Sequence, residues 1–109
     1  MKFGLSEESY NKIKDIVNKY NKYQFKIFGS RARGDYKLAS DIDIAVYGNM
    51  EESDKYSIMN DLDIIDIPYM IDLVFMQDIS KKDFIKSIER DGVILWVDLM
   101  KEKKTIKTH

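Results

Sequence analysis

The most constraining feature of the sequence is the alternating segment Asp-Ile-Asp-Ile-Ala-Val-Tyr that begins at Asp41. Alternation of this kind, with a period of two, is typical of a β-strand that buries one face. Ile42, Ile44 and Val46 would share the buried face. Asp41 and Asp43 would share the opposite face, close enough together to bind the same hard divalent cation.

A plainer interpretation of this segment is a half-buried strand whose polar face is solvated. Aspartate is depleted in strands, however, and like charges aligned on one face are destabilising. The pairing of Asp41 and Asp43 therefore favours a catalytic or metal-binding role.

A glycine-bounded turn, Gly29-Ser30-Arg31-Ala32-Arg33-Gly34, lies upstream of the two aspartates. Glycine lets backbone amides approach phosphate oxygens closely, Ser30 adds a hydroxyl donor, and Arg31 or Arg33 adds charge-assisted donors. The turn predicts a phosphate-binding site, with two solvated loop cations as the alternative for the arginines. It is not a P-loop, because no Lys-Ser or Lys-Thr pair follows the second glycine.

A third acidic residue, Asp72, lies midway along a second predicted strand, residues 70 to 76. If this strand neighbours the strand of Asp41 and Asp43 and the acidic faces match, three carboxylates can hold two Mg²⁺ ions for in-line displacement at phosphorus. Taken alone, Asp72 is better explained as a partly exposed strand residue paired with a lysine. Its position after a predicted strand–helix unit favours the catalytic interpretation.

The other patterns predict a single small domain that mixes helices and strands. Ser6 is a typical N-cap for the first helix, and Ser80 gives a second capping signal. The predicted elements are a helix over residues 6 to 22, a strand over 25 to 28, a helix over 51 to 65 and a helix from 80 to about 92.

The C-terminal part of the sequence is less regular. A short apolar run over residues 93 to 97 precedes a lysine-rich tail, residues 101 to 109. We expect this tail to fray or to be extended by a partner. No internal boundary divides the chain, so residues 1 to 109 are predicted to form one domain.

Composition excludes several classes of function. The chain of 109 residues has no Cys and its one His is His109, which excludes thiol and histidine-based catalysis. The net charge of -1 gives no broad basic surface for direct contact with nucleic acid. No stretch approaches the roughly 20 apolar residues of a membrane span, and no signal segment is evident, so a cytoplasmic protein is expected.

Together, these motifs resemble the signature of the DNA polymerase β-like nucleotidyltransferase superfamily, and most closely its minimal nucleotidyltransferases. The resemblance covers about residues 24 to 97. It rests on the order and spacing of three motifs: Gly29-Ser30 with Arg33-Gly34, then Ser40-Asp41-Ile42-Asp43, then Ile71-Asp72-Leu73-Val74. The fold that it implies is α+β, a small mixed β-sheet flanked by helices, as in the palm of polymerase β relatives.

The resemblance also implies a role for each matched residue. Asp41, Asp43 and Asp72 would be the catalytic metal ligands of two Mg²⁺ ions, with Asp72 on the ion that helps to deprotonate the acceptor hydroxyl. Five residues would bind the nucleoside triphosphate: Gly29, Ser30, Arg31, Arg33 and Ser40.

Finally, the resemblance implies a partner. The minimal nucleotidyltransferases that this chain resembles act as antitoxins, which transfer AMP from ATP to a Tyr of a helical HEPN-type toxin encoded nearby. The resemblance therefore implies a hetero-oligomer. Two alternatives stay open. One is transfer to a small molecule such as an aminoglycoside, with a partner subunit completing the site. The other is a non-catalytic antitoxin that acts by binding, although such a protein has no physical need for three mutually repelling carboxylates.

Overall fold

Four strands form one mixed sheet in the computed structural model, which describes residues 2–95. The strands are β1 (Gln24–Phe28), β2 (Ile42–Tyr47), β3 (Ile71–Phe75) and β4 (Val93–Ile94), and their order across the sheet is β3-β2-β1-β4. β1 runs antiparallel to β2 and to β4, whereas β2 and β3 run parallel. The prediction of a small mixed sheet is confirmed.

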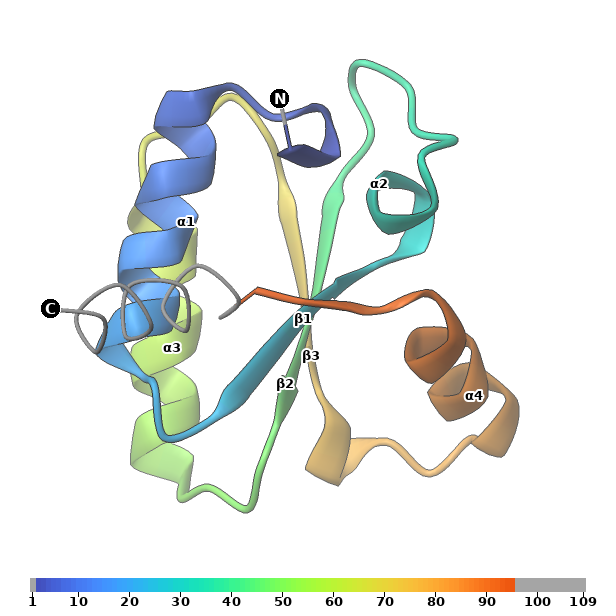
Figure 1. Ribbon diagram of the computed structural model, residues 1–109. Helices are drawn as coiled ribbons and strands as arrows, with labels where there is room; N and C mark the ends of the chain where they lie inside the picture. The colour runs from blue at the N-terminus through green and yellow to red at the C-terminus, as the bar shows by residue number, and fades with distance from the viewer. Residues whose placement is uncertain (1, 96–109) are drawn as a thin grey trace, which may run out of the picture.

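Helices cover both faces of this sheet (Figure 1). α1 (Glu7–Lys19) and α3 (Glu52–Ile64) pack on one face, and α2 (Gly29–Arg33) and α4 (Lys82–Asp91) lie on the other. Two short 3-10 turns, η1 (Lys2–Gly4) and η2 (Met76–Asp78), complete the described elements. The expected α+β class is therefore correct.

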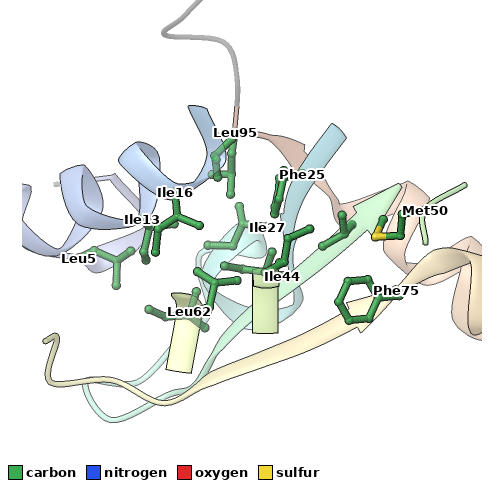
Figure 2. Packing of buried hydrophobic residues seen from close by; sticks show 14 residues of the cluster. Leu5, Ile13, Ile16, Phe25, Ile27, Ile44, Met50, Leu62, Phe75 and Leu95 are labelled. Carbon is green, nitrogen blue, oxygen red and sulfur yellow. The ribbon is translucent and has the colours of Figure 1, made fainter. Parts of the chain in front are cut away.

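Side chains of β2 alternate between two separate hydrophobic cores, one on each face of the sheet. Ile42, Ile44 and Val46 are fully buried in the larger core, where they meet side chains of α1 and α3 (Figure 2). Ala45 points to the opposite face and packs in a smaller core with Phe28 and with residues of α4. Apolar side chains therefore pack against both faces of β2 from Ile44 onward. The acidic side chain of Asp43 lies at the end where the strand begins.

The two helix-capping predictions have opposite outcomes. The Ser6 hydroxyl caps α1 and accepts a hydrogen bond of 3.1 Å from the Ser9 amide, as expected. The Ser80 prediction is wrong, because α4 begins at Lys82 with Lys81 as its N-cap and with no side-chain cap. The chain stays extended for longer after η2 than the pattern indicates, which leaves Ser80 outside the helix.

Part of the C-terminal prediction falls outside the described residues. β4 is the described beginning of the apolar run, and Leu95 is buried against the larger core. Residues 96 and 97 and the predicted tail, 101 to 109, are not described. Among residues 2–95, no helix combines the length and the apolar character needed to cross a membrane.

Asp61 ties α3 to α1 and should make stability depend on pH. Its carboxylate accepts hydrogen bonds from the Tyr20 hydroxyl at 2.5 Å and from the Lys19 ammonium at 2.9 Å, and these bonds hold its pKa below the usual value. A carboxyl whose pKa is lower in the folded state stabilises the fold above its unfolded pKa and loses that contribution as the pH falls through its folded pKa.

We therefore expect Asp61→Asn to lower the free energy of unfolding at pH 7 by about 1 kcal/mol. The difference from the wild type should shrink as the pH falls below about 4, which urea denaturation at several pH values would measure. Asp63→Asn on the same helix is the control and should change little. A difference that stays constant down to pH 2 would contradict this account.

Candidate active site

The parallel pairing of β2 with β3 brings two of the predicted carboxylates together. In this register Asp43 lies directly beside Asp72 on the neighbouring strand. The side-chain alternation of both strands places these two carboxylates on the same face, opposite Ile42 and Ile44 of the larger core. The expectation that the two acidic strands are neighbours with matching faces is confirmed.

Asp41 joins this pair at the end of the sheet. It is exposed and precedes β2 by one residue. Burial raises the pKa of Asp43 above its usual value, and the negative charges of Asp72 and Asp41 raise it further. Arg33 lowers it. Asp43 is therefore within electrostatic reach of Asp72, Asp41 and Arg33.

The glycine turn lies against the same carboxylates. Phe28, the last residue of β1, pairs with Asp43, and Gly29 follows it with a φ of 73°. A Cβ at Gly29 would overlap the Asp43 carboxylate. Only glycine fits here, since the position needs both a left-handed backbone and the absence of a side chain. The sequence motifs of glycine turn and paired aspartates thus meet at one place.

Ser30 follows at the start of the short helix α2. Its side chain is half-buried, and its hydroxyl makes no hydrogen bond to any residue from 2 to 95. Its carbonyl accepts the amides of Gly34 and Asp35, which closes the turn. The backbone of Ser30 is therefore held in place while its hydroxyl can still bind a ligand, which is consistent with the predicted nucleotide contact without testing it.

Arg31 has a structural role that differs from the predicted phosphate contact. The side chain is 2% exposed, and its guanidinium donates to the carbonyls of Ser40, Phe3 and Leu38. Burying a cation is costly unless donors find acceptors, and these carbonyls supply them. Phosphate contact would require Arg31 to leave these partners.

Two aromatic residues complete the surroundings of this buried cation. The rings of Tyr36 and Tyr69 have their centroids 5.1 and 4.7 Å from the guanidinium carbon of Arg31. Cation–π contacts of this kind are strongest where water is excluded. The sequence analysis missed both tyrosines, because no local pattern links Tyr69 to an arginine so far away in the chain.

Ser40 is also part of this loop framework. Its carbonyl accepts two hydrogen bonds from Arg31, at 3.1 and 2.8 Å, and its hydroxyl accepts the amide of Lys37 at 2.8 Å. Both groups therefore shape the segment that leads into Asp41. The predicted nucleotide contact of Ser40 stays a prediction.

Arg33 remains available to a ligand. Its side chain is 44% exposed, and it forms ion pairs with Asp35 at 3.1 Å and with Asp91 of α4 at 3.4 Å. The pair with Asp35 is exposed on both sides and is therefore weak, whereas Asp91 is only 12% exposed. Of the two arginines in the turn, Arg33 is thus the one with the geometry for a phosphate contact.

The carboxylates do not form a ready-made metal site. Within residues 2–95, no three acidic or histidine side chains converge closely enough to hold an ion. Asp41, Asp43 and Asp72 are nevertheless neighbours at one sheet end, and they are hard oxygen donors that suit Mg²⁺. Their role as ligands stays a prediction.

Comparisons with known proteins agree with this arrangement. The family profile described as "Polymerase beta, Nucleotidyltransferase" matches residues 11–99. A comparison with curated proteins gives no match. Two similar solved structures are both toxin–antitoxin assemblies, and at their level of identity they show a shared fold.

The first is a toxin–antitoxin with AMP-PNP. It is 24% identical with a TM-score of 0.57, and the match covers 91% of this chain and 85% of that chain. The second is the toxin–antitoxin MntA-HepT, 21% identical with a TM-score of 0.54, covering 94% of this chain and 86% of that chain.

The two arginines of the turn provide a matched pair of variants. Arg31→Lys should lower the free energy of unfolding by about 3 kcal/mol, because an ammonium cannot reach the three carbonyls at once and a charge stays buried. Arg33→Lys should change it by less than about 0.5 kcal/mol. Chemical denaturation of both variants tests this, and equal losses would contradict a special structural role for Arg31.

Proposed function

The chain belongs to the polymerase beta nucleotidyltransferase family, and from this premise we propose that it transfers AMP from ATP to a hydroxyl acceptor. The acceptor that we propose is a Tyr of a helical HEPN-type toxin, so that the protein acts as an antitoxin by adenylylating its partner. The observation that carries the proposal is the register that sets Asp43 beside Asp72, with Gly29 against the Asp43 carboxylate.

The carboxylates fit the divalent metal that nucleotidyltransferases of this fold generally use. Asp43 is half-buried, and its pKa is raised first by this burial and then by the negative charges of Asp72 and Asp41, which is an arrangement that a cation would stabilise. Asp41, Asp43 and Asp72 would hold Mg²⁺, two ions by the family pattern. Bound there, the metal would neutralise triphosphate charge and lower the pKa of the acceptor hydroxyl.

The protein's own groups would mainly bind and orient the triphosphate. Gly29 lets the turn lie directly against the Asp43 carboxylate, which a side chain there would displace, and Ser30, whose hydroxyl has no hydrogen-bond partner among residues 2–95, can offer it to a phosphate oxygen. Arg33 adds an exposed cation next to the carboxylates. Placement and charge neutralisation of this kind account for much of the catalysis of phosphoryl and nucleotidyl transfer.

The bond changes follow from in-line displacement. The acceptor oxygen forms a bond to the α-phosphorus of ATP, and the bond from that phosphorus to the oxygen bridging to the β-phosphate breaks. Pyrophosphate leaves, and the proton of the acceptor hydroxyl passes to solvent.

Two findings support the ATP and antitoxin parts of this proposal. One similar structure is a toxin–antitoxin with AMP-PNP, an ATP analogue, and another is the toxin–antitoxin MntA-HepT. Within residues 2–95, Asp41 and Asp72 are both exposed, which leaves this side of the site open. An acceptor carried on another protein would cover this open side.

Adenylylation can be tested with α-labelled ATP, Mg²⁺ and the purified product of the adjacent gene. We expect the wild type to label the partner, and Asp43→Asn to reduce the labelling rate by about a hundredfold or more while keeping the fold. Asp15→Asn, an exposed aspartate of α1 outside the carboxylate cluster, is the control and should keep most activity.

The antitoxin role needs a second readout, namely the activity of the partner after incubation. If Asp43→Asn silences the partner as well as the wild type does, neutralisation occurs by binding and the catalytic account of the antitoxin is wrong. Label on a small molecule in place of the partner would favour the alternative acceptor.

A further inference from the structure

A groove of about 770 Å³ lies between α3 and the edge strand β3. Its lining includes Tyr56 and Met59 of α3 and Tyr69 and Met70 of the segment that leads into β3. We call this the α3–β3 groove. Tyr56, Met59 and Met70 are 66%, 46% and 74% exposed. Large apolar side chains that are exposed side by side mark a binding surface.

The sequence of α3 provides this surface in addition to the core. Ile58 and Leu62, four residues apart, are buried on the side that faces the sheet. Tyr56, Met59 and Asp63 follow at spacings of three and four and line the groove. A helix that only covers a sheet needs one apolar stripe, so the second stripe of α3 is not explained by folding.

The charge of the groove narrows the choice of occupant. Among the residues that the structure describes, no Lys, Arg or His lines the groove, whereas Asp63 does. Within residues 2–95, Asp63 has no ion pair. The other carboxylates of α3 are all paired: Glu52 with Lys55, Asp54 with Lys22, and Asp61 with Lys19. An occupant with a positively charged side chain could pair with Asp63, as lysines pair with the other carboxylates of α3.

A second copy of the chain fits this surface poorly. A symmetric contact sets the same patch of two protomers against each other, which would bring two unpaired Asp63 carboxylates into one interface. A neutral apolar molecule would fill the groove and leave Asp63 desolvated without a partner. A helix with an apolar stripe and a flanking Lys or Arg satisfies both the shape and the charge.

We propose that the α3–β3 groove receives an amphipathic helix of the partner protein, with apolar side chains between Tyr56 and Met70 and a Lys or Arg against Asp63. The identity of that partner rests on the proposed function, whereas the groove and its charge rest on the residues themselves. Methionine side chains adapt to different apolar shapes, which suits such a docking site.

The groove lies beside the candidate active site. Ile71 and Leu73 line it, and Asp72 between them points to the other face of β3, toward Asp43. Tyr69 also lines the groove, and its ring covers the guanidinium of Arg31, which holds the loop before Asp41. A helix bound here would therefore position an acceptor at the edge of the sheet that carries Asp72.

The experiment measures binding separately from catalysis. Isothermal titration of the full chain with the purified product of the adjacent gene gives the Kd, without ATP. We expect Met59→Glu and Met70→Glu each to weaken binding at least about tenfold, and Asp63→Lys to weaken it and reduce its salt dependence. Ile64→Glu is the matched control, since Ile64 is on α3 and exposed but does not line the groove.

The variants change exposed side chains, and circular dichroism with thermal melting checks that they fold. The proposal is overturned if Met59→Glu and Met70→Glu bind the partner with the same Kd as the wild type. It is also overturned if the wild type does not bind the partner. A dimer of the wild type, seen by light scattering, that Met70→Glu dissociates overturns it as well, because the occupant is then a second copy. If the wild type binds but transfers no label while the groove variants lose binding, this inference stands and the proposed catalysis fails.

Discussion

The parallel pairing of β2 with β3 is the constraint on which the rest of the structure depends. Parallel strands need a long connection, and α3 supplies it on the face that carries the larger core. The same pairing sets Asp43 beside Asp72 and leaves β3 at the edge of the sheet. One topological choice therefore creates the acidic site, the helix that shields the core, and the groove next to both.

A buried cation holds the site's framework in place. The guanidinium of Arg31 joins three separate stretches of chain, the N-terminal segment through Phe3, the loop before β2 through Ser40, and the start of β3 through the ring of Tyr69. A buried charge with one partner removed is strongly destabilising, so these contacts are maintained together. The segment that presents Asp41 is consequently held by contacts within the protein itself.

The site concentrates negative charge where folding alone gives no reason for it. Asp43 of β2 lies partly buried near two like charges, while Asp54 and Asp61 of α3 have lysine partners. Such repulsion is tolerated where a cation offsets it, which agrees with a family of nucleotidyltransferases that generally use a divalent metal. Under the proposed function, the exposed groove near Asp72 would let the acceptor arrive on a partner that has its own binding surface.

The sequence by itself determined most of the local elements and indicated the candidate site. Alternation from Asp41 onward fixed a strand with two aspartates on one face, and Gly29 marked a turn that admits no side chain, because both signals arise from neighbouring residues. Only the tertiary structure decided what distant segments do to one another. It showed that Asp72 is adjacent to Asp43, since strand pairing is not encoded by spacing, and that Arg31 is a buried brace while Arg33 is exposed, since both are cations in the same turn. Which of the two faces the interior depends on carbonyls and rings contributed by other parts of the chain.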